Sequence, residues 1–272
     1  MLTPTALLLL AANVGLTAYT FQRQDLFQRL LFQIRPVLQG QWYRLITAGF
    51  LHVSWTHLLF NMLSLYFFAG VVEQRLGALG FLLLYLASLL GGNALSLALQ
   101  RKNLSYSAVG ASGAVSGVVY AAIVFNPGMK LAFILLPIPF PAWIFGIGFI
   151  LYSMYGMNKG SDGIGHEAHL GGALSGLLLA IALRPDLAQQ HPLTLIYIAV
   201  PAAVFLVIRL VKPRLLGMTQ PTGRENWDVE DHYRAQRKAR EDEFNRILEK
   251  IQATGRDSLT DEEENFLNRH AR

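Results

Sequence analysis

Long apolar runs dominate the first four fifths of the chain. A helix needs about 20 mostly apolar residues to cross the roughly 30 Å hydrocarbon core of a bilayer. Seven runs meet this requirement: 5–21, 56–74, 78–99, 109–126, 133–155, 167–184 and 193–211. The first run has no basic segment before it, so we expect a retained helix rather than a cleaved signal peptide. The pattern predicts an all-α polytopic membrane protein with six or seven helices.

Two stretches interrupt this pattern. Residues 22–55 interleave apolar side chains with four arginines, which favours a segment lying in the membrane interface. Within it, Trp42 and Arg44 are typical of an anchor at the headgroup boundary. The run 133–155 contains three prolines, so its helix is predicted to begin near Pro141, after a loop at the membrane surface.

Charge divides the chain near residue 216. Of the 272 residues only 15% are charged, and residues 1–216 hold 13 Lys+Arg and 5 Asp+Glu, against 10 and 13 in residues 217–272. The net charge of +5 is therefore no indication of a nucleic-acid partner. We expect a membrane domain at 1–211 (core 1–184, extra hydrophobic helix 193–211), a linker at 212–227 and a charged helical tail at 228–272. The absence of cysteine excludes disulfides, thiolate metal sites and a Cys nucleophile.

The tail is predicted to be a soluble helical hairpin. Residues 228–252 form a charged helix with an apolar stripe, and Gly255 is expected to end it. Thr260 and Glu263 match a capping box, which predicts the start of a last short helix. Two roles remain open, namely a docking module for an unknown partner and an appendage for folding and stability.

Polar side chains within the apolar runs are the candidate functional residues, because they are costly in lipid. His57 and Asn61 are four residues apart and share one helical face, so they can donate to the same point. Hydrogen bonding between helices is the alternative. Gly110-Ala111-Ser112-Gly113 opens the fourth run, where the free amides of a helix N-terminus favour a developing oxyanion. Capping or packing is the alternative for Ser112.

The sixth run begins His166-Glu167-Ala168-His169. A metalloprotease helix needs histidines four residues apart, whereas these are three apart, so zinc is not expected. Glu167 points about 160–200° away around the helix from the His169 face. A serine and histidine unit here would therefore be a dyad.

His169 shares its face with a glycine stripe. Gly172 and Gly176 follow it at helical spacing, and such a face lets another helix approach closely. If this face packs against Gly113 and Gly117 of the fourth run, His169 reaches Ser112. A neutral imidazole within hydrogen-bond distance would then make the serine a nucleophile.

Four motifs follow one another along the chain. They are Trp42-x-Arg44, His57-x-x-x-Asn61, Gly110-x-Ser112-Gly113 and Ala168-His169-x-x-Gly172-x-x-x-Gly176. Together, in this order and on these runs, they resemble the rhomboid intramembrane serine proteases. The resemblance covers residues 1–184, and extends to 211 as the variant with an extra C-terminal helix. It implies a six-helix bundle with a water-filled active site below the membrane surface.

The resemblance also implies residue roles. Ser112 would be the nucleophile and His169 the general base, then the general acid. His57, Asn61 and the backbone N–H of Ser112 would form the oxyanion hole. Supporting positions would be Trp42, Arg44, His52, Gly110, Gly113, Gly172 and Gly176. No cofactor and no metal are implied.

The implied partners are transmembrane protein substrates within the lipid bilayer. The protein would be an integral multi-pass membrane protein, predicted to reside in a cell (plasma) membrane. A catalytically inactive rhomboid-like protein that binds membrane clients is the main alternative. A transporter or channel is a third, but it would be expected to carry charged residues at mid-membrane. Retention of both Ser112 and His169 favours the protease.

Two features depart from the family pattern. The family often has an aromatic ring four residues after the nucleophile, beneath the histidine, whereas this chain has Ser116, with Tyr120 one turn later. In addition, Lys and Arg are concentrated in the loops that the family places outside, which the positive-inside rule would place inside. The side of the tail depends on whether 193–211 crosses the membrane.

Overall fold

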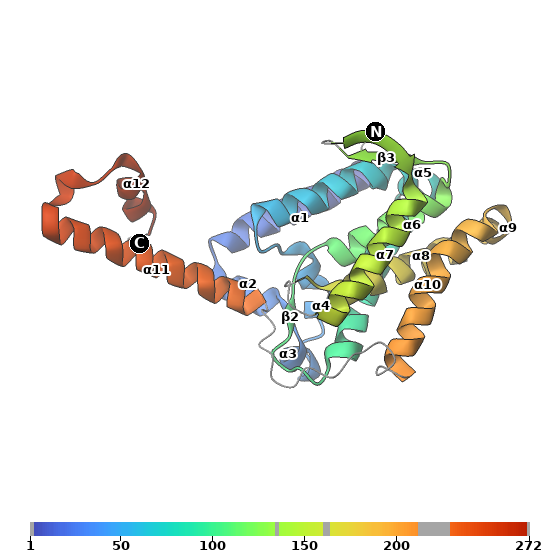
Figure 1. Ribbon diagram of the computed structural model, residues 1–272, viewed down its shortest axis with the longest axis horizontal. Helices are drawn as coiled ribbons and strands as arrows, with labels where there is room; N and C mark the ends of the chain where they lie inside the picture. Colours follow the sequence, from blue (N-terminus) through green and yellow to red (C-terminus); the bar gives the residue numbers. More distant parts are fainter. Residues whose placement is uncertain (1–2, 134–135, 160–163, 212–228, 271–272) are drawn as a thin grey trace. The chain divides into compact units, whose positions relative to one another are not determined.

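The computed structural model describes residues 3–133, 136–159, 164–211 and 229–270. The chain divides into two compact units, Met1–Asp228 and Val229–Arg272, which we describe separately. Most of the described residues in each unit are helical (Figure 1).

Six helices of the first unit carry the apolar runs. They are α1 (Pro4–Phe21), α5 (Trp55–Gln100), α6 (Ser112–Phe125), α7 (Ala142–Lys159), α8 (His166–Leu183) and α10 (Pro192–Val211). Among the described residues, α1, α5, α8 and α10 are long and apolar enough to cross a membrane, and α6 and α7 are shorter apolar helices. The mostly helical, polytopic membrane fold predicted from the sequence is confirmed.

Helix α5 is broken once. Gly77 has φ +70° and ψ 173°, a backbone conformation that glycine adopts without a steric penalty, and it separates residues 55–76 from 78–100. An unbroken helix of this length would extend about 69 Å, more than twice the thickness of the hydrocarbon core. The two parts correspond to the predicted runs 56–74 and 78–99.

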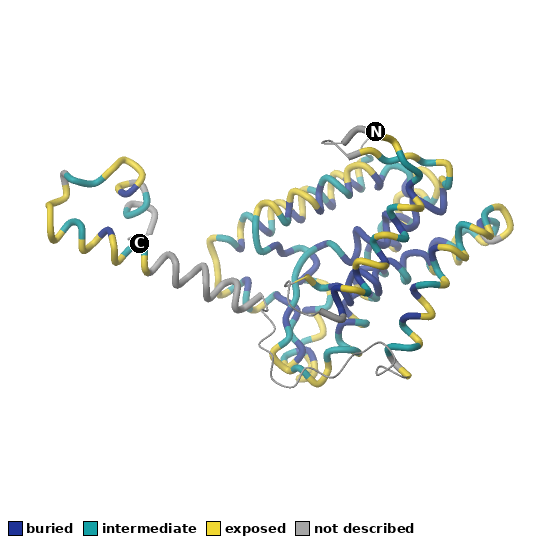
Figure 2. Tube along the Cα trace, viewed as in Figure 1, coloured by how far each residue is buried: buried dark blue, intermediate teal, exposed yellow. Residues whose placement is uncertain are grey.

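Helix α6 lies at the centre of the unit, packed against α5, α7 and α8. Every residue from Gly113 to Phe125 is buried (Figure 2). A helix that is apolar on all sides needs such an interior position. The residue that begins this buried helix is Ser112.

Small residues let α6 and α8 approach closely. A methyl group added to Gly172 would overlap the carbonyl group of Gly113, and one added to Gly176 would overlap the backbone of Gly117. Ser88 of α5 also packs against this contact, because a methyl group added to Gly117 would overlap the Ser88 side chain. The two glycine faces therefore pack together, and the first turns of α6 and α8 lie side by side.

Residues 22–54 fold into a series of short elements. These are α2 (Gln24–Leu30), β1 (Phe32–Gln33), α3 (Ile34–Leu38), α4 (Arg44–Thr47) and η1 (Ala48–Phe50). Strand β1 pairs antiparallel with β2 (Ser107–Ala108), which ties this segment to the loop before α6. Its apolar side chains form a small cluster of their own around Phe32, Ile34, Val37 and Ala48.

The Arg44 guanidinium holds this segment together. Its Nη1 donates to the carbonyl oxygens of Gln28 (2.8 Å) and Leu31 (2.7 Å), and its Nε donates to Gln41 Oε1 (2.8 Å). Arg44 is only 6% exposed, whereas Trp42 is 56% exposed. The arginine therefore stabilises the loop itself, which agrees with the supporting position that the resemblance implied, and it is not an anchor at the headgroup boundary.

The proline-containing stretch before α7 is a β-hairpin, where the sequence predicted a loop. Strand β3 (Lys130–Phe133) pairs antiparallel with β4 (Leu136–Pro141), with Leu131 opposite Phe140. Proline has no backbone N–H to donate to a partner strand. Prolines at alternate positions of β4 can all place their nitrogen on the edge that faces away from β3, which an edge strand allows. Helix α7 begins at Ala142, directly after Pro141, as predicted.

The second unit is a helical hairpin of α11 (Val229–Thr254), η3 (Arg256–Ser258) and α12 (Asp261–His270). Gly255, with φ +83°, follows the last residue of α11. The backbone N–H of Thr260 donates to Glu263 Oε2 (2.9 Å), and the N–H of Glu263 donates to Thr260 Oγ1 (3.3 Å). The predicted helix end and capping box are both confirmed.

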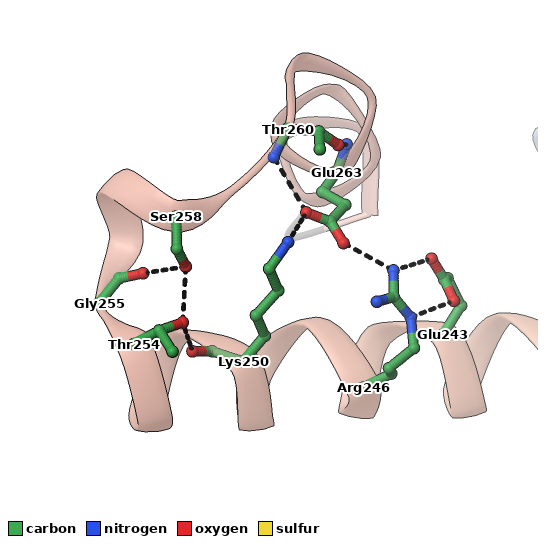
Figure 3. A network of polar contacts seen from close by, with 8 residues as sticks. All are labelled: Glu243, Arg246, Lys250, Thr254, Gly255, Ser258, Thr260 and Glu263. Atoms are coloured by element: carbon green, nitrogen blue, oxygen red, sulfur yellow. Dashed lines mark hydrogen bonds and ion pairs between the residues drawn. The ribbon is translucent and has the colours of Figure 1, made fainter.

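Glu263 also joins the two helices of the hairpin (Figure 3). Its carboxylate accepts from Lys250 Nζ (2.7 Å) and Arg246 Nη2 (2.8 Å), and Arg246 pairs with Glu243 as well. These contacts, that of Lys250 first, lower the pKa of Glu263 to about 2. The network therefore keeps Glu263 ionised at physiological pH.

Candidate active site

Ser112 is the first residue of α6, but it does not cap the helix. Ala111 occupies the N-cap position, and no side-chain hydrogen bond closes this end. The first backbone N–H groups of a helix have no partner within it and carry a partial positive charge. Capping is therefore not the role of Ser112, and its hydroxyl lies beside donors suited to an anion.

Gly110 brings His57 next to Ser112. A Cβ atom on Gly110 would lie 2.7 Å from His57 Cε1, 2.9 Å from His57 Nε2 and 3.7 Å from Ser112 Oγ. Gly110 has φ +124°, and its N–H donates to the carbonyl oxygen of Ala48 (3.0 Å). Only glycine combines this backbone conformation with so close an approach of the imidazole.

Asn61 lies one turn after His57 on α5. Its Nδ2 donates to the carbonyl oxygen of His57 (2.9 Å), and Ser54 caps the helix by accepting from the N–H of His57 (3.1 Å). An amide group has two N–H donors, so this bond occupies one of them and leaves one for another acceptor. The local bond orients the Asn61 side chain within the bundle.

His52 links α1 to the turn before Ser112. Its Nε2 accepts from the N–H of Ala111 (3.5 Å), and its Nδ1 contacts Thr17 Oγ1 (3.0 Å). An accepting Nε2 places the proton on Nδ1, which then donates to Thr17. Burial, and next the nearby His57, lower the pKa of His52 to about 3, so it is neutral at physiological pH. The two imidazole rings meet edge to face at 4.9 Å.

His169 lies in the first turn of α8 and is 9% exposed. The close contact between Gly113 and Gly172 adjoins both Ser112 and His169, because Ser112 precedes Gly113 and His169 lies one turn before Gly172. The structure thus brings the starts of α5, α6 and α8, with His57, Ser112 and His169, to one end of the bundle.

Two aromatic contacts surround His169. The ring of Phe149, from α7, lies 5.3 Å from the imidazole with an angle of 33° between the planes, and His166 meets it edge to face at 6.0 Å. Phe149 is not predicted from the sequence, because the family pattern places the aromatic ring beneath the histidine on α6. The one available signal was an aromatic residue within the apolar run of α7.

Glu167 is directed elsewhere, as its helical position predicted. Its carboxylate accepts from Gln100 Nε2 (2.6 Å) and from the hydroxyl of Tyr106 (3.5 Å). Burial first, and then the charge of Glu167, raise the pKa of Tyr106 well above its usual value. Within the described ranges, no group of three or more His, Asp or Glu residues is arranged to hold a metal ion.

The fold is that of a polytopic membrane protein, and its polar residues form a candidate serine-hydrolase site at one end of the bundle. The chain belongs to the rhomboid family, because the family model "Rhomboid domain" matches residues 39–186. A second model, of a family of unknown function (DUF6576), matches residues 227–272.

Curated relatives agree with this assignment. The chain is 30% identical over 182 residues to RHOMBOID-like protein 12, mitochondrial, of Arabidopsis thaliana, covering 61% of this chain and 54% of the relative. It is 28% identical over 192 residues to Rhomboid protease GluP of Bacillus subtilis, covering 70% of this chain and 34% of the relative. It is 30% identical over 175 residues to Rhomboid protease AarA of Providencia stuartii, covering 58% of this chain and 60% of the relative. The chain spans about half the length of the curated relatives it matches.

Proposed function

We propose that the protein is an intramembrane serine endopeptidase that cleaves transmembrane segments of membrane-protein substrates. Family membership and relatives named proteases support the proposal. The observation that carries it is the meeting of three helix starts, with His57 against Gly110 beside Ser112, and the Gly113–Gly172 contact next to His169.

In the proposed mechanism, Ser112 Oγ attacks a backbone carbonyl carbon of the substrate while His169 accepts the hydroxyl proton. His169 then gives this proton to the leaving amine, and water hydrolyses the acyl-enzyme with His169 again as base. Glu167 is engaged with Gln100 and Tyr106, which favours a dyad over a triad.

The oxyanion of the tetrahedral intermediate would be met by His57, the second N–H of the Asn61 amide and the backbone N–H of Ser112. Loss of one such donor typically raises the barrier by about 2.7–4 kcal/mol, which is about 100- to 1,000-fold in kcat. We therefore expect His57→Ala and Asn61→Ala to keep the fold and lose most of the activity.

Substrates are proposed to have helix-destabilising residues near the scissile bond. The carbonyl groups of an intact transmembrane helix are engaged in hydrogen bonds within the helix and are not open to attack. The protein is proposed to act in a plasma membrane, which subcellular fractionation with an antibody to the tail would test.

We also propose that α10 is a seventh span and that 228–272 is a separate tail domain. The proposed linker, 212–227, lies outside the described residues. Helix α10 buries Ile198, Ala202 and Phe205 on one face and exposes apolar residues on the other, which suits contact with lipid. Because the chain has no cysteine, single cysteines placed at Gln190 and Thr254 can be labelled from either side of sealed vesicles. If α10 crosses, the two positions react from opposite sides.

The test of the proposed activity is cleavage of a labelled transmembrane substrate by purified protein in liposomes. Ser112→Ala and His169→Ala should each abolish cleavage, whereas EDTA should have no effect. Ser64→Ala is a matched control, because the Ser64 hydroxyl bonds only to its own helix at Phe60 O (2.8 Å). Cleavage that survives Ser112→Ala would refute the dyad.

The second candidate is a catalytically inactive rhomboid-like protein that binds membrane clients. Ser116, in place of an aromatic residue, is the observation that favours it. Folded wild-type protein that cleaves none of several substrates, but is captured with intact membrane proteins, would support this alternative.

A further inference from the structure

The imidazole of His169 rests on an aromatic ring from α7. The Phe149 ring centroid lies 5.3 Å from that of His169, and the planes are 33° apart, closer to stacked than to perpendicular. Phe145, one turn earlier on α7, stacks on Phe149 in turn (6.1 Å, 22°). Within the described part of the chain, Phe149 is thus the residue of this pair whose ring contacts His169, and Phe145 contacts Phe149.

Helix α6 does not supply this ring. At position 116, one turn after Ser112, the side chain is a serine whose hydroxyl donates to the carbonyl oxygen of Ser112 (2.7 Å). Tyr120, a further turn along, packs against Phe149 (6.4 Å, 53°). Tyr120 of α6 thus contacts Phe149, and it is α7 that provides a ring against the histidine.

Helix α7 is fixed on both sides of Phe149. A Cβ atom on Gly146 would lie 3.2 Å from Ile123 Cδ1, and the hydroxyl of Tyr120 donates to the carbonyl oxygen of Gly146, so this turn docks on α6. At Gly156 the α7 backbone lies directly against the imidazole of His166, on α8. Contacts made by glycine backbone leave little freedom, so the Phe149 ring is held in a defined place relative to α8.

We infer that Phe149 is a positioning residue for the general base, which deepens the proposed function and rests on it. The ring limits the orientations open to the His169 imidazole. When His169 takes the proton of Ser112, the negative face of the Phe149 ring also stabilises the positive charge that develops. The base of the dyad therefore depends on α7, a helix that contributes no member of the dyad.

Three variants test the inference in the full-length protein in liposomes. Phe149→Leu removes the ring but keeps an apolar side chain, Phe149→Tyr keeps the ring, and Phe145→Leu is a matched control on the same helix. We expect Phe149→Leu to lower kcat about 5- to 30-fold with KM nearly unchanged. The rate at which a fluorophosphonate labels Ser112 should fall in parallel. Phe149→Tyr should restore both, and Phe145→Leu should stay close to wild type.

A spectroscopic measurement gives a readout that does not require activity. In protein carrying Ser112→Ala and ¹³C-labelled histidine, the adjacent Phe149 ring should shield the His169 Cε1–H signal, and Phe149→Leu should move that signal downfield. The signal is assigned by its absence in His169→Gln.

The outcomes separate the two hypotheses. If wild type neither cleaves nor reacts with the phosphonate, the proposed function fails, and the inference fails with it. If wild type is active but Phe149→Leu matches it in kcat, or Phe145→Leu loses as much, the inference alone is overturned. A change in KM alone, or an unmoved His169 signal, also overturns it.

Discussion

A single added methyl group at Gly172 should abolish the proposed activity without unfolding the protein. The residue lies where the backbones of α6 and α8 are in direct contact, one turn from His169. A Cβ atom at this position would lie 2.6 Å from the carbonyl carbon of Gly113 and 2.9 Å from its Cα. All three of its nearest atoms belong to the backbone, so no side chain can rotate to make room.

The size of the effect follows from these distances. Carbon atoms in contact prefer a separation of about 3.5–4.0 Å, so α8 must move away from α6 by about 1 Å. Overpacking of this kind typically costs about 1–3 kcal/mol of stability, which a folded bundle can tolerate. A displacement of about 1 Å between reacting groups, however, lowers the rate about 100-fold. We therefore expect Gly172→Ala to reduce kcat far more than it reduces stability.

The assay compares substrate cleavage with thermal unfolding in the same detergent. Gly15→Ala is the matched control, because a Cβ atom on Gly15 of α1 would meet nothing within 4 Å. That variant should keep full activity and be as stable as wild type, or slightly more so, since alanine favours a helix interior. Wild-type activity in Gly172→Ala would refute the reasoning, because it would mean that the contact between α6 and α8 does not set the geometry of the site.

Three further predictions concern other parts of the molecule. Arg44→Met should lower the unfolding temperature, because it removes the donor to the buried carbonyl oxygen of Leu31, at about 1–3 kcal/mol, and to the partly buried carbonyl oxygen of Gln28; an unchanged temperature would contradict this. The pKa of His52 is about 3 in the folded protein and about 6.5 in the unfolded chain. Between these two pH values the imidazole is therefore protonated in the unfolded chain but neutral in the folded protein. The free energy of unfolding should fall by up to about 1.4 kcal/mol per pH unit as pH drops through this window. Unfolding measured at pH 7 and pH 5 should show a smaller dependence of stability on pH for His52→Gln than for wild type. Ile247→Ala, at a fully buried position, should destabilise the tail by about 2–5 kcal/mol, whereas Leu248→Ala, at a position 38% exposed, should leave the stability of the tail unchanged. Amide hydrogen exchange of residues 229–270 in the full chain measures the stability of the tail in each variant.

Features determined by neighbours in the chain could be predicted from the sequence. The capping box of Thr260 and Glu263 depends on hydrogen bonds between residues three apart, and the start of α7 depends on the restriction that Pro141 imposes locally. The glycine faces of α6 and α8 are also visible in the sequence, because helical spacing places Gly172 and Gly176 on one face.

Features that depend on a partner far along the chain were missed or misread. Three alternating prolines disfavour a helix, but a loop and an edge strand are equally compatible with them until a partner strand is known. Likewise, Phe149 could not be matched to His169 before α7 was placed beside α8. The residue pattern alone placed Arg44 at the headgroup boundary, and only the resemblance implied a supporting position, because its acceptors, the carbonyl oxygens of Gln28 and Leu31, leave no sign in the sequence.

The position of the candidate residues explains how a hydrolytic site can be built into an apolar bundle. His57 is the third residue of α5, Ser112 the first of α6 and His169 the fourth of α8, so all three lie in the first turn of a helix. At these ends the helix dipoles are positive, which favours a developing anion. The N–H groups of His57 and His169 already donate to Ser54 Oγ and to the carbonyl oxygen of Gly165, whereas no side chain caps the start of α6 at Ser112. Beyond the first turn α6 is buried along its whole length, with its backbone groups bonded within the helix. The candidate catalytic residues thus lie together at one end of the bundle, whereas the remainder of α6 is suited to packing against its neighbours.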